Sequence, residues 1–77
     1  MYDRYMKYRD LIHELKRLGF WEVPGGKHEK WTDGLISIPV PRPKGGREMK
    51  RFTAEGILRN ARMAAANRSK KQGSNRP

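Results

Sequence analysis

A glycine pair, a histidine and a tryptophan follow one another in Gly25-Gly26-Lys27-His28-Glu29-Lys30-Trp31, and Thr32-Asp33-Gly34-Leu35 comes next. An Asp-Gly pair between two β-prone segments is the strongest short-range signal for a two-residue hairpin turn. With Asp33 and Gly34 as the turn, five pairs of residues lie opposite one another: Thr32 and Leu35, Trp31 and Ile36, Lys30 and Ser37, Glu29 and Ile38, His28 and Pro39. The sequence therefore predicts an antiparallel hairpin.

Side chains alternate along each strand, so the hairpin should have one apolar and one polar face. The apolar face, expected to be buried, holds Trp31, Ile36, Ile38 and Val40. The polar face holds His28, Lys30 and Ser37. Glu29 falls on the apolar face, so we expect it at the margin of the sheet or beside a bulge near Gly26.

An amphipathic helix is expected before the hairpin. Its apolar residues recur at three- and four-residue steps: Tyr5, Tyr8, Leu11, Ile12, Leu15 and Leu18. Gly19 suits the left-handed conformation that follows a helix, so the helix should end at Leu18. Its start is open between Asp3, as an N-cap, and Met6-Lys7. The short β-prone segment from Phe20 to Val23, closed by a proline and two glycines, is interpreted as the first strand.

The segment after the hairpin is basic. Pro39, Pro41 and Pro43 lack a backbone donor, so the third strand should fade from Pro39 onward. Five cations then accompany the single acid Glu48: Arg42, Lys44, Arg47, Lys50 and Arg51. This pattern predicts a pliable cationic loop.

A second helix and a tail complete the expected elements. Thr53 is the expected N-cap, and Glu55 is favoured in the first turn by the helix dipole. A narrow apolar stripe follows, suited to close packing: Ala54, Ile57, Leu58, Ala61 and Ala65. Residues 67–77 offer nothing to bury that would offset the entropy of ordering them, so we expect a disordered basic tail.

The expected order of elements is α-β-β-β-α. Both helices need the single apolar face of a three-stranded antiparallel sheet, which predicts a two-layer α+β domain over residues 1–66. A chain of this size has room for one such domain.

Charge and composition narrow the possible functions. The chain of 77 residues holds 18 Lys and Arg against 8 Asp and Glu, a formal net charge of +10. This excess goes beyond what solubility requires and favours an acidic partner, most commonly nucleic acid. The lack of cysteine fits a cytoplasmic protein, and no apolar run is long enough to span a membrane. No set of side chains has metal-ligand spacing, so neither a metal nor a cofactor is expected.

Two histidines are candidates for proton transfer. His13 lies on the flank of the first helix, where a solvated histidine is the usual explanation. His28 lies on the polar face of the hairpin, close to Lys27 and Lys30. Taken alone, an exposed strand histidine is more often without a catalytic role.

Four short motifs follow one another along the chain. They are Met6-Lys7-Tyr8-Arg9-Asp10-Leu11-Ile12 with Leu15 and Gly19-Phe20; Gly26-Lys27-His28-Glu29-Lys30-Trp31; Ile38-Pro39 with Pro41-Arg42; and Glu48-Met49-Lys50 with Thr53, Ile57-Leu58-Arg59 and Ala61. In order and spacing they resemble HicA-type toxins, the RNA-cleaving partners of HicB antitoxins in prokaryotic toxin–antitoxin pairs. The second motif is similar to the Gly-Ser-His signature of that family. Two positions depart from the pattern: Lys27 replaces a small polar residue, and Pro43 stands where many members have a second histidine.

The resemblance implies a fold like that of double-stranded-RNA-binding domains and a metal-independent endoribonuclease acting on mRNA. It makes His28 the catalytic residue, which takes a proton from a ribose 2′-OH as that group attacks the adjacent phosphate, or protonates the leaving oxygen. Lys27 and Lys30 would stabilise the developing charge. The resemblance also implies inhibition by a HicB-like antitoxin protein.

Cations near these motifs are the candidates for RNA contact. The set is Lys27, Lys30, Arg42, Lys44, Lys50 and Arg51. Two other functions are open at this point: a non-catalytic RNA-binding module, which charge and fold support equally well, and a basic accessory protein of a ribonucleoprotein.

Overall fold

The computed structural model describes residues 4–25 and 29–74, apart from the side chains of residues 44 and 70–74. Within these ranges the elements follow in the order β1 (Tyr5–Lys7), α1 (Tyr8–Arg17), β2 (Trp21–Val23), β3 (Glu29–Thr32), β4 (Ser37–Val40), the 3-10 turn η1 (Lys44–Gly46), β5 (Glu48–Lys50) and α2 (Arg51–Ser74). Neither described helix is long and apolar enough to cross a membrane.

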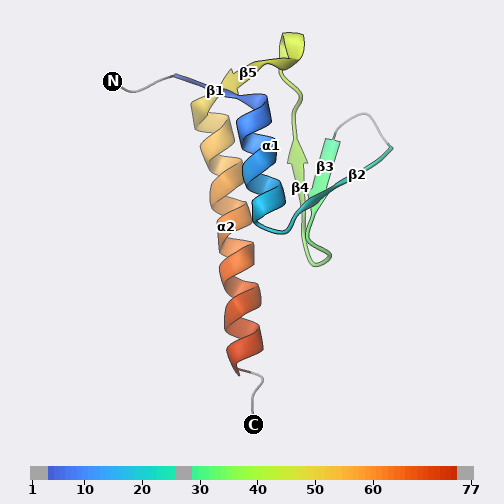
Figure 1. Ribbon diagram of the computed structural model, residues 1–77, viewed down its shortest axis with the longest axis vertical. Coiled ribbons are helices and arrows are strands. Elements are labelled where there is room, and N and C mark those ends of the chain that lie inside the picture. Colours follow the sequence, from blue (N-terminus) through green and yellow to red (C-terminus); the bar gives the residue numbers. More distant parts are fainter. Residues whose placement is uncertain (1–3, 26–28, 75–77) are drawn as a thin grey trace.

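The elements form an α+β fold with two small sheets. α1 and α2 lie side by side, and the antiparallel sheet β2-β3-β4 lies next to them (Figure 1). β1 and β5 pair as a two-stranded antiparallel ribbon where both helices begin. The predicted α-β-β-β-α series is therefore present, with the β1–β5 ribbon added to it.

The hydrophobic core lies between the helices and one face of the sheet. Its buried members are Leu11, Leu15, Phe20, Trp31, Ile38, Val40, Met49, Ala54, Ile57, Leu58 and Ala61. Trp31, Ile38 and Val40 occupy the apolar face of the hairpin, as predicted. The prediction is wrong for Ile36, which is 41 % exposed because it belongs to the turn and not to β4. It is also wrong for Tyr5, which lies in β1 instead of a helix and is 53 % exposed.

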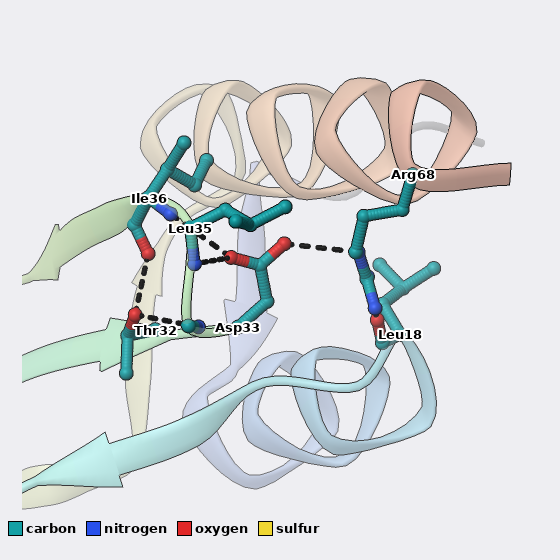
Figure 2. Close-up of polar contacts among 7 residues, drawn as sticks. Leu18, Thr32, Asp33, Leu35, Ile36 and Arg68 are labelled. Atoms are coloured by element: carbon teal, nitrogen blue, oxygen red, sulfur yellow. Dashed lines mark hydrogen bonds and ion pairs between the residues drawn. The ribbon is translucent and has the colours of Figure 1, made fainter. Parts of the chain in front are cut away.

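The β3–β4 hairpin has a longer turn than the Asp-Gly pair predicts. Thr32 pairs with Ser37, which leaves four residues for the turn. Asp33 shapes this turn, because its Oδ1 accepts the backbone N–H of Leu35 at 2.9 Å and that of Ile36 at 3.0 Å (Figure 2). The predicted turn type needs a left-handed φ at both central residues, and among the described residues only glycines adopt one. The register differs from the prediction by two residues, so the side chains within β3 and β4 keep their predicted faces.

The end of α1 agrees with the prediction. Leu18 is the C-cap, and its N–H donates to the carbonyl of Glu14 at 3.0 Å. Gly19 follows with φ of +92°. The backbone then turns sharply enough for Phe20 to donate its N–H to the carbonyl of Leu15 and bury its ring. This turn carries the chain from α1 into β2.

The boundaries of α2 differ from the prediction at both ends. The helix begins at Arg51, two residues before Thr53, because the residue that precedes β1 supplies an acceptor: the N–H of Arg51 donates to the carbonyl of Arg4 at 2.8 Å. The helix continues to Ser74, which corrects the expectation of disorder for residues 67–74, while the rest of the expected tail lies outside the described residues. Arg68 gives a physical reason, since its side chain bonds to groups of α1 and the β3–β4 turn across the molecule.

The segment between the hairpin and α2 is more ordered than the predicted loop. It contains η1 and β5, and β5 pairs with β1 through Lys50 opposite Tyr5 and Met49 opposite Met6. The N–H of Tyr8 donates to the carbonyl of Arg47 at 2.7 Å, which joins the ribbon to the start of α1.

Candidate nucleic-acid interface

One face of the three-stranded sheet is left uncovered by the helices. The pairs Trp21–Thr32 and Lys30–Pro39 lie on the opposite side of the sheet from the buried Trp31. This uncovered side, called the open face, consists of Trp21, Val23, Lys30, Thr32, Ser37 and Pro39. Trp21, Lys30, Ser37 and Pro39 are all exposed. The open face is therefore accessible to a ligand.

Lys30 is the predicted RNA-binding residue that the structure places on the open face. It is exposed and stands at the second position of β3. Lys27 and His28, the predicted catalytic residue, lie outside the described residues, as does the side chain of Lys44. In the sequence, His28 directly precedes the first residue of β3.

Trp21 is a residue of the open face that the sequence predicted only as part of a strand. It is 52 % exposed, whereas Trp31 is 3 % exposed. The sequence contains a signal for the exposure of Trp21, because Phe20 and Trp21 are adjacent aromatic residues at the start of the predicted strand. Successive strand side chains point to opposite faces, so only one of the two can enter the core.

Glu29 gathers three donors at the margin of the sheet, which was one of the two positions predicted for it. Tyr8 donates its hydroxyl to Oε1 of Glu29, and Nε1 of Trp31 donates to the same oxygen at 3.2 Å. Arg42 donates through Nε to Oε2 at 2.9 Å and also through a terminal nitrogen. The guanidinium carbon of Arg42 lies 6.0 Å from the centroid of the Tyr8 ring. These four residues are called the Glu29 cluster.

The Glu29 cluster fixes Arg42 without covering it. The side chain of Glu29 is 11 % exposed, whereas that of Arg42 is 67 % exposed. A guanidinium has five N–H donors, so an arginine that is held by a carboxylate can still present donors to an anion. Arg42, predicted to contact RNA, is therefore a preoriented cation at the edge of the sheet.

The Glu29 cluster also sets the charges of its members. Burial raises the pKa of Tyr8 to about 12, and the hydrogen bond to Glu29 adds to this effect. Burial also acts to raise the pKa of Glu29, but hydrogen bonds from Tyr8, Trp31 and Arg42 outweigh it and hold that pKa below its ordinary value. At neutral pH Glu29 is therefore an anion and Tyr8 a neutral donor, so neither is poised to transfer a proton.

A second cationic region lies at the β1–β5 ribbon. A cleft of about 470 Å³ is lined there by Lys7, Arg9, Gly46, Arg47 and Glu48. Lys50, a predicted RNA-binding residue, is exposed on β5. Arg51 is less available, because its side chain is 29 % exposed and lies 4.0 Å from the carboxylate of Glu55. Those predicted RNA-binding residues whose side chains are described are thus divided among the open face, the Glu29 cluster, the ribbon and the start of α2.

No three His, Cys, Asp or Glu side chains gather as a metal site within residues 4–25 and 29–74. Comparisons of the chain with protein-family models, curated proteins and solved structures returned no match. The function is therefore inferred from the residues, their charges and their arrangement.

Proposed function

We propose that this chain is a HicA-type endoribonuclease toxin that binds mRNA across the open face and cleaves it with His28. The open face carries the proposal. The helices cover only one side of the sheet, Lys30 is exposed on the other side, and His28 is the residue just before β3. A cationic surface next to a histidine is a suitable arrangement for holding a phosphodiester beside a general acid or base.

The order of elements and the charge support the same proposal. The series α1-β2-β3-β4-α2 has the order of a double-stranded-RNA-binding domain, which is the fold proposed here. A net charge of +10 on 77 residues favours a polyanionic partner over a neutral one. The motifs that resemble those of HicA-type toxins begin at Met6 and end at Ala61, so they are spread over a span that includes α1, the three-stranded sheet and the first part of α2.

In the proposed reaction His28 transfers one proton, in one of two ways. His28 accepts the proton of a ribose 2′-OH while the oxygen attacks the adjacent phosphorus, or it donates a proton to the departing 5′-oxygen. Lys30, with Lys27, stabilises the negative charge that develops on the phosphate oxygens. The nucleophile belongs to the RNA itself, so the reaction proceeds without a divalent metal.

Substitution of His28 tests the proposal directly. We expect His28→Ala to abolish cleavage of an RNA transcript, and His13→Ala, an exposed change on α1, to leave cleavage intact. Both variants are assayed in the presence of EDTA, and circular dichroism on the same preparations reports folding.

The outcomes separate the candidate functions. A folded His28→Ala protein that still cleaves RNA would contradict the catalytic assignment. A wild-type protein that binds RNA and never cleaves it would favour the non-catalytic RNA-binding module. Cleavage that stops in EDTA and returns with one added metal would contradict the 2′-OH mechanism.

We further propose that a HicB-like antitoxin of acidic charge silences the toxin by covering the open face. Complementary charge speeds such an association and makes its rate depend on salt. Lys30→Glu should then slow the association more than Lys16→Glu, since Lys16 is exposed on α1, away from the sheet. Equal effects of the two changes would indicate inhibition at another surface.

A further inference from the structure

Trp21 is held in an exposed position by its neighbours. It begins β2 and pairs with Thr32. Its ring extends to the β3–β4 turn, where a Cβ placed on Gly34 would lie 3.5 Å from Cη2 of the indole. Gly34 has φ of +94°, which a residue with a side chain rarely adopts, so the turn meets the edge of the ring with a glycine. The indole thus rests on the turn at one edge and remains 52 % exposed.

Two residues of β3, Thr32 and Lys30, are the polar neighbours of Trp21 on the open face. The hydroxyl of Thr32 forms its hydrogen bonds within the turn: it donates to the carbonyl of Ile36 at 2.6 Å and accepts the N–H of Gly34 at 3.0 Å. Lys30 pairs with Val23, two residues after Trp21 on the same face. Such diagonal neighbours in an antiparallel sheet are about 7–8 Å apart, within reach of long side chains. An aromatic ring and a flexible cation are thus available to one ligand.

A nucleotide has the chemistry that fits this pair. Its base offers a flat π-face that stacks on an indole, and its phosphate takes the charge of a lysine. A base inside a duplex is already stacked on its neighbours, so only an unpaired base can lie on a protein ring. The net charge of +10 favours a polyanion over an apolar ligand.

We infer that Trp21 stacks on an unpaired RNA base while Lys30 contacts a neighbouring phosphate, so that the substrate is single-stranded RNA. This inference rests on the proposed function and adds the substrate class to it. Trp21 binds and positions the RNA, and it takes no part in proton transfer. The order of elements is that of a duplex-binding domain, but the surface that binds RNA would be suited to single strands.

Binding measurements on the full chain test the inference. Three fully 2′-O-methylated RNAs, which cannot be cleaved through a 2′-OH, serve as probes: an unpaired oligonucleotide, the same oligonucleotide with its bases replaced by abasic sites, and a duplex. Stacking on an aromatic side chain contributes about 1–3 kcal/mol per base, so Trp21→Ala should weaken binding of the unpaired RNA by roughly 5- to 150-fold. Binding of the abasic RNA should be weak and almost unchanged by the substitution.

Two further variants serve as controls. Trp21→Phe keeps an aromatic face and should retain most of the affinity for unpaired RNA. In the wild type, stacking of a base on Trp21 should quench the indole fluorescence, and this quenching should be lost in Trp21→Phe. Phe52→Ala removes an aromatic residue that is 86 % exposed on α2, outside the sheet, and should leave RNA affinity unchanged. Circular dichroism on each variant checks that the fold is intact.

Each result supports or overturns the inference. The inference is overturned if Trp21→Ala and the wild type bind the unpaired RNA with equal affinity. It is also overturned if Trp21→Ala weakens the binding of unpaired RNA and of abasic RNA by the same factor. Tighter binding of the duplex overturns the assignment to single strands. If Trp21→Ala binds normally while cleavage still depends on His28, the stacking role fails and the proposed function stands. If the wild type neither binds nor cleaves RNA, both fail.

Discussion

Strand β3 has an acid–arginine pair at each end, and the two pairs differ in burial. At the start of β3, Glu29 holds Arg42, whose side chain is 67 % exposed. Directly after β3, Asp33 holds Arg68 with Nε 2.9 Å from Oδ2, and the side chain of Asp33 is fully buried. Arg68 also donates to the carbonyl of Leu18 at 2.5 Å (Figure 2).

The difference in burial separates an arginine that stabilises the fold from one that remains accessible to a ligand. Arg68 makes three contacts across the molecule. It lies against Asp33 in the turn after β3, donates to the C-cap residue of α1, and places its guanidinium carbon 5.8 Å from the ring centroid of Phe20. Removing one member of a buried ion pair leaves the other charge without compensation, which is costly. An exposed pair contributes little to stability, because water and salt screen it. Arg42 can therefore serve a ligand, whereas Arg68 serves the fold.

The largest expected effect is the loss of stability in Arg68→Ala. The change leaves the buried carboxylate of Asp33 and the carbonyl of Leu18 without the guanidinium, and we expect the free energy of unfolding to fall by about 3 kcal/mol. Urea denaturation measures this change. Arg59→Ala, at an exposed position of α2, is the matched control and should stay close to wild type. If both variants lose the same free energy of unfolding, the contacts of Arg68 do not stabilise the fold, and the distinction between the two ends of β3 fails.

A smaller effect, on binding and not on stability, is expected for Arg42→Ala. The fold should unfold at nearly the wild-type urea concentration, because the Arg42 side chain is exposed and Glu29 keeps its hydrogen bonds from Tyr8 and Trp31. Affinity for single-stranded RNA should decrease, and the slope of log affinity against log salt should flatten by about one phosphate contact. Arg59→Ala again serves as the control. An unchanged slope together with a large loss of stability would make Arg42 a structural residue like Arg68.

The sequence predicted what depends on local pattern. The end of α1 at Leu18 follows from Gly19, and the buried side of the hairpin follows from the alternation of Trp31 with its neighbours. These features depend on residues close together in the chain, where periodicity and turn chemistry apply.

The remaining features depend on contacts between distant residues. The start of α2 is set by the carbonyl of Arg4, which is far from Arg51 in sequence. The helical conformation beyond Ala66 could not be read from apolar content, because a polar side chain, Arg68, makes the tertiary contacts. The four-residue turn depends on Asp33, whose carboxylate accepts backbone donors that a simple Asp-Gly rule does not consider. For the candidate site, sequence identified Lys30 and Arg42 as cations but could not show which one is held by a carboxylate.

Binding of RNA to the open face can be tested most directly by a two-dimensional ¹H–¹⁵N nuclear magnetic resonance titration of the full chain with an unpaired, fully 2′-O-methylated RNA. We predict the largest shifts at the Trp21 indole N–H and at the backbone amides of Lys30 and Ser37, with little change on the outer side of α2 at Arg59. Shifts confined to α2 and the β1–β5 ribbon, with the open face unchanged, would contradict the claim.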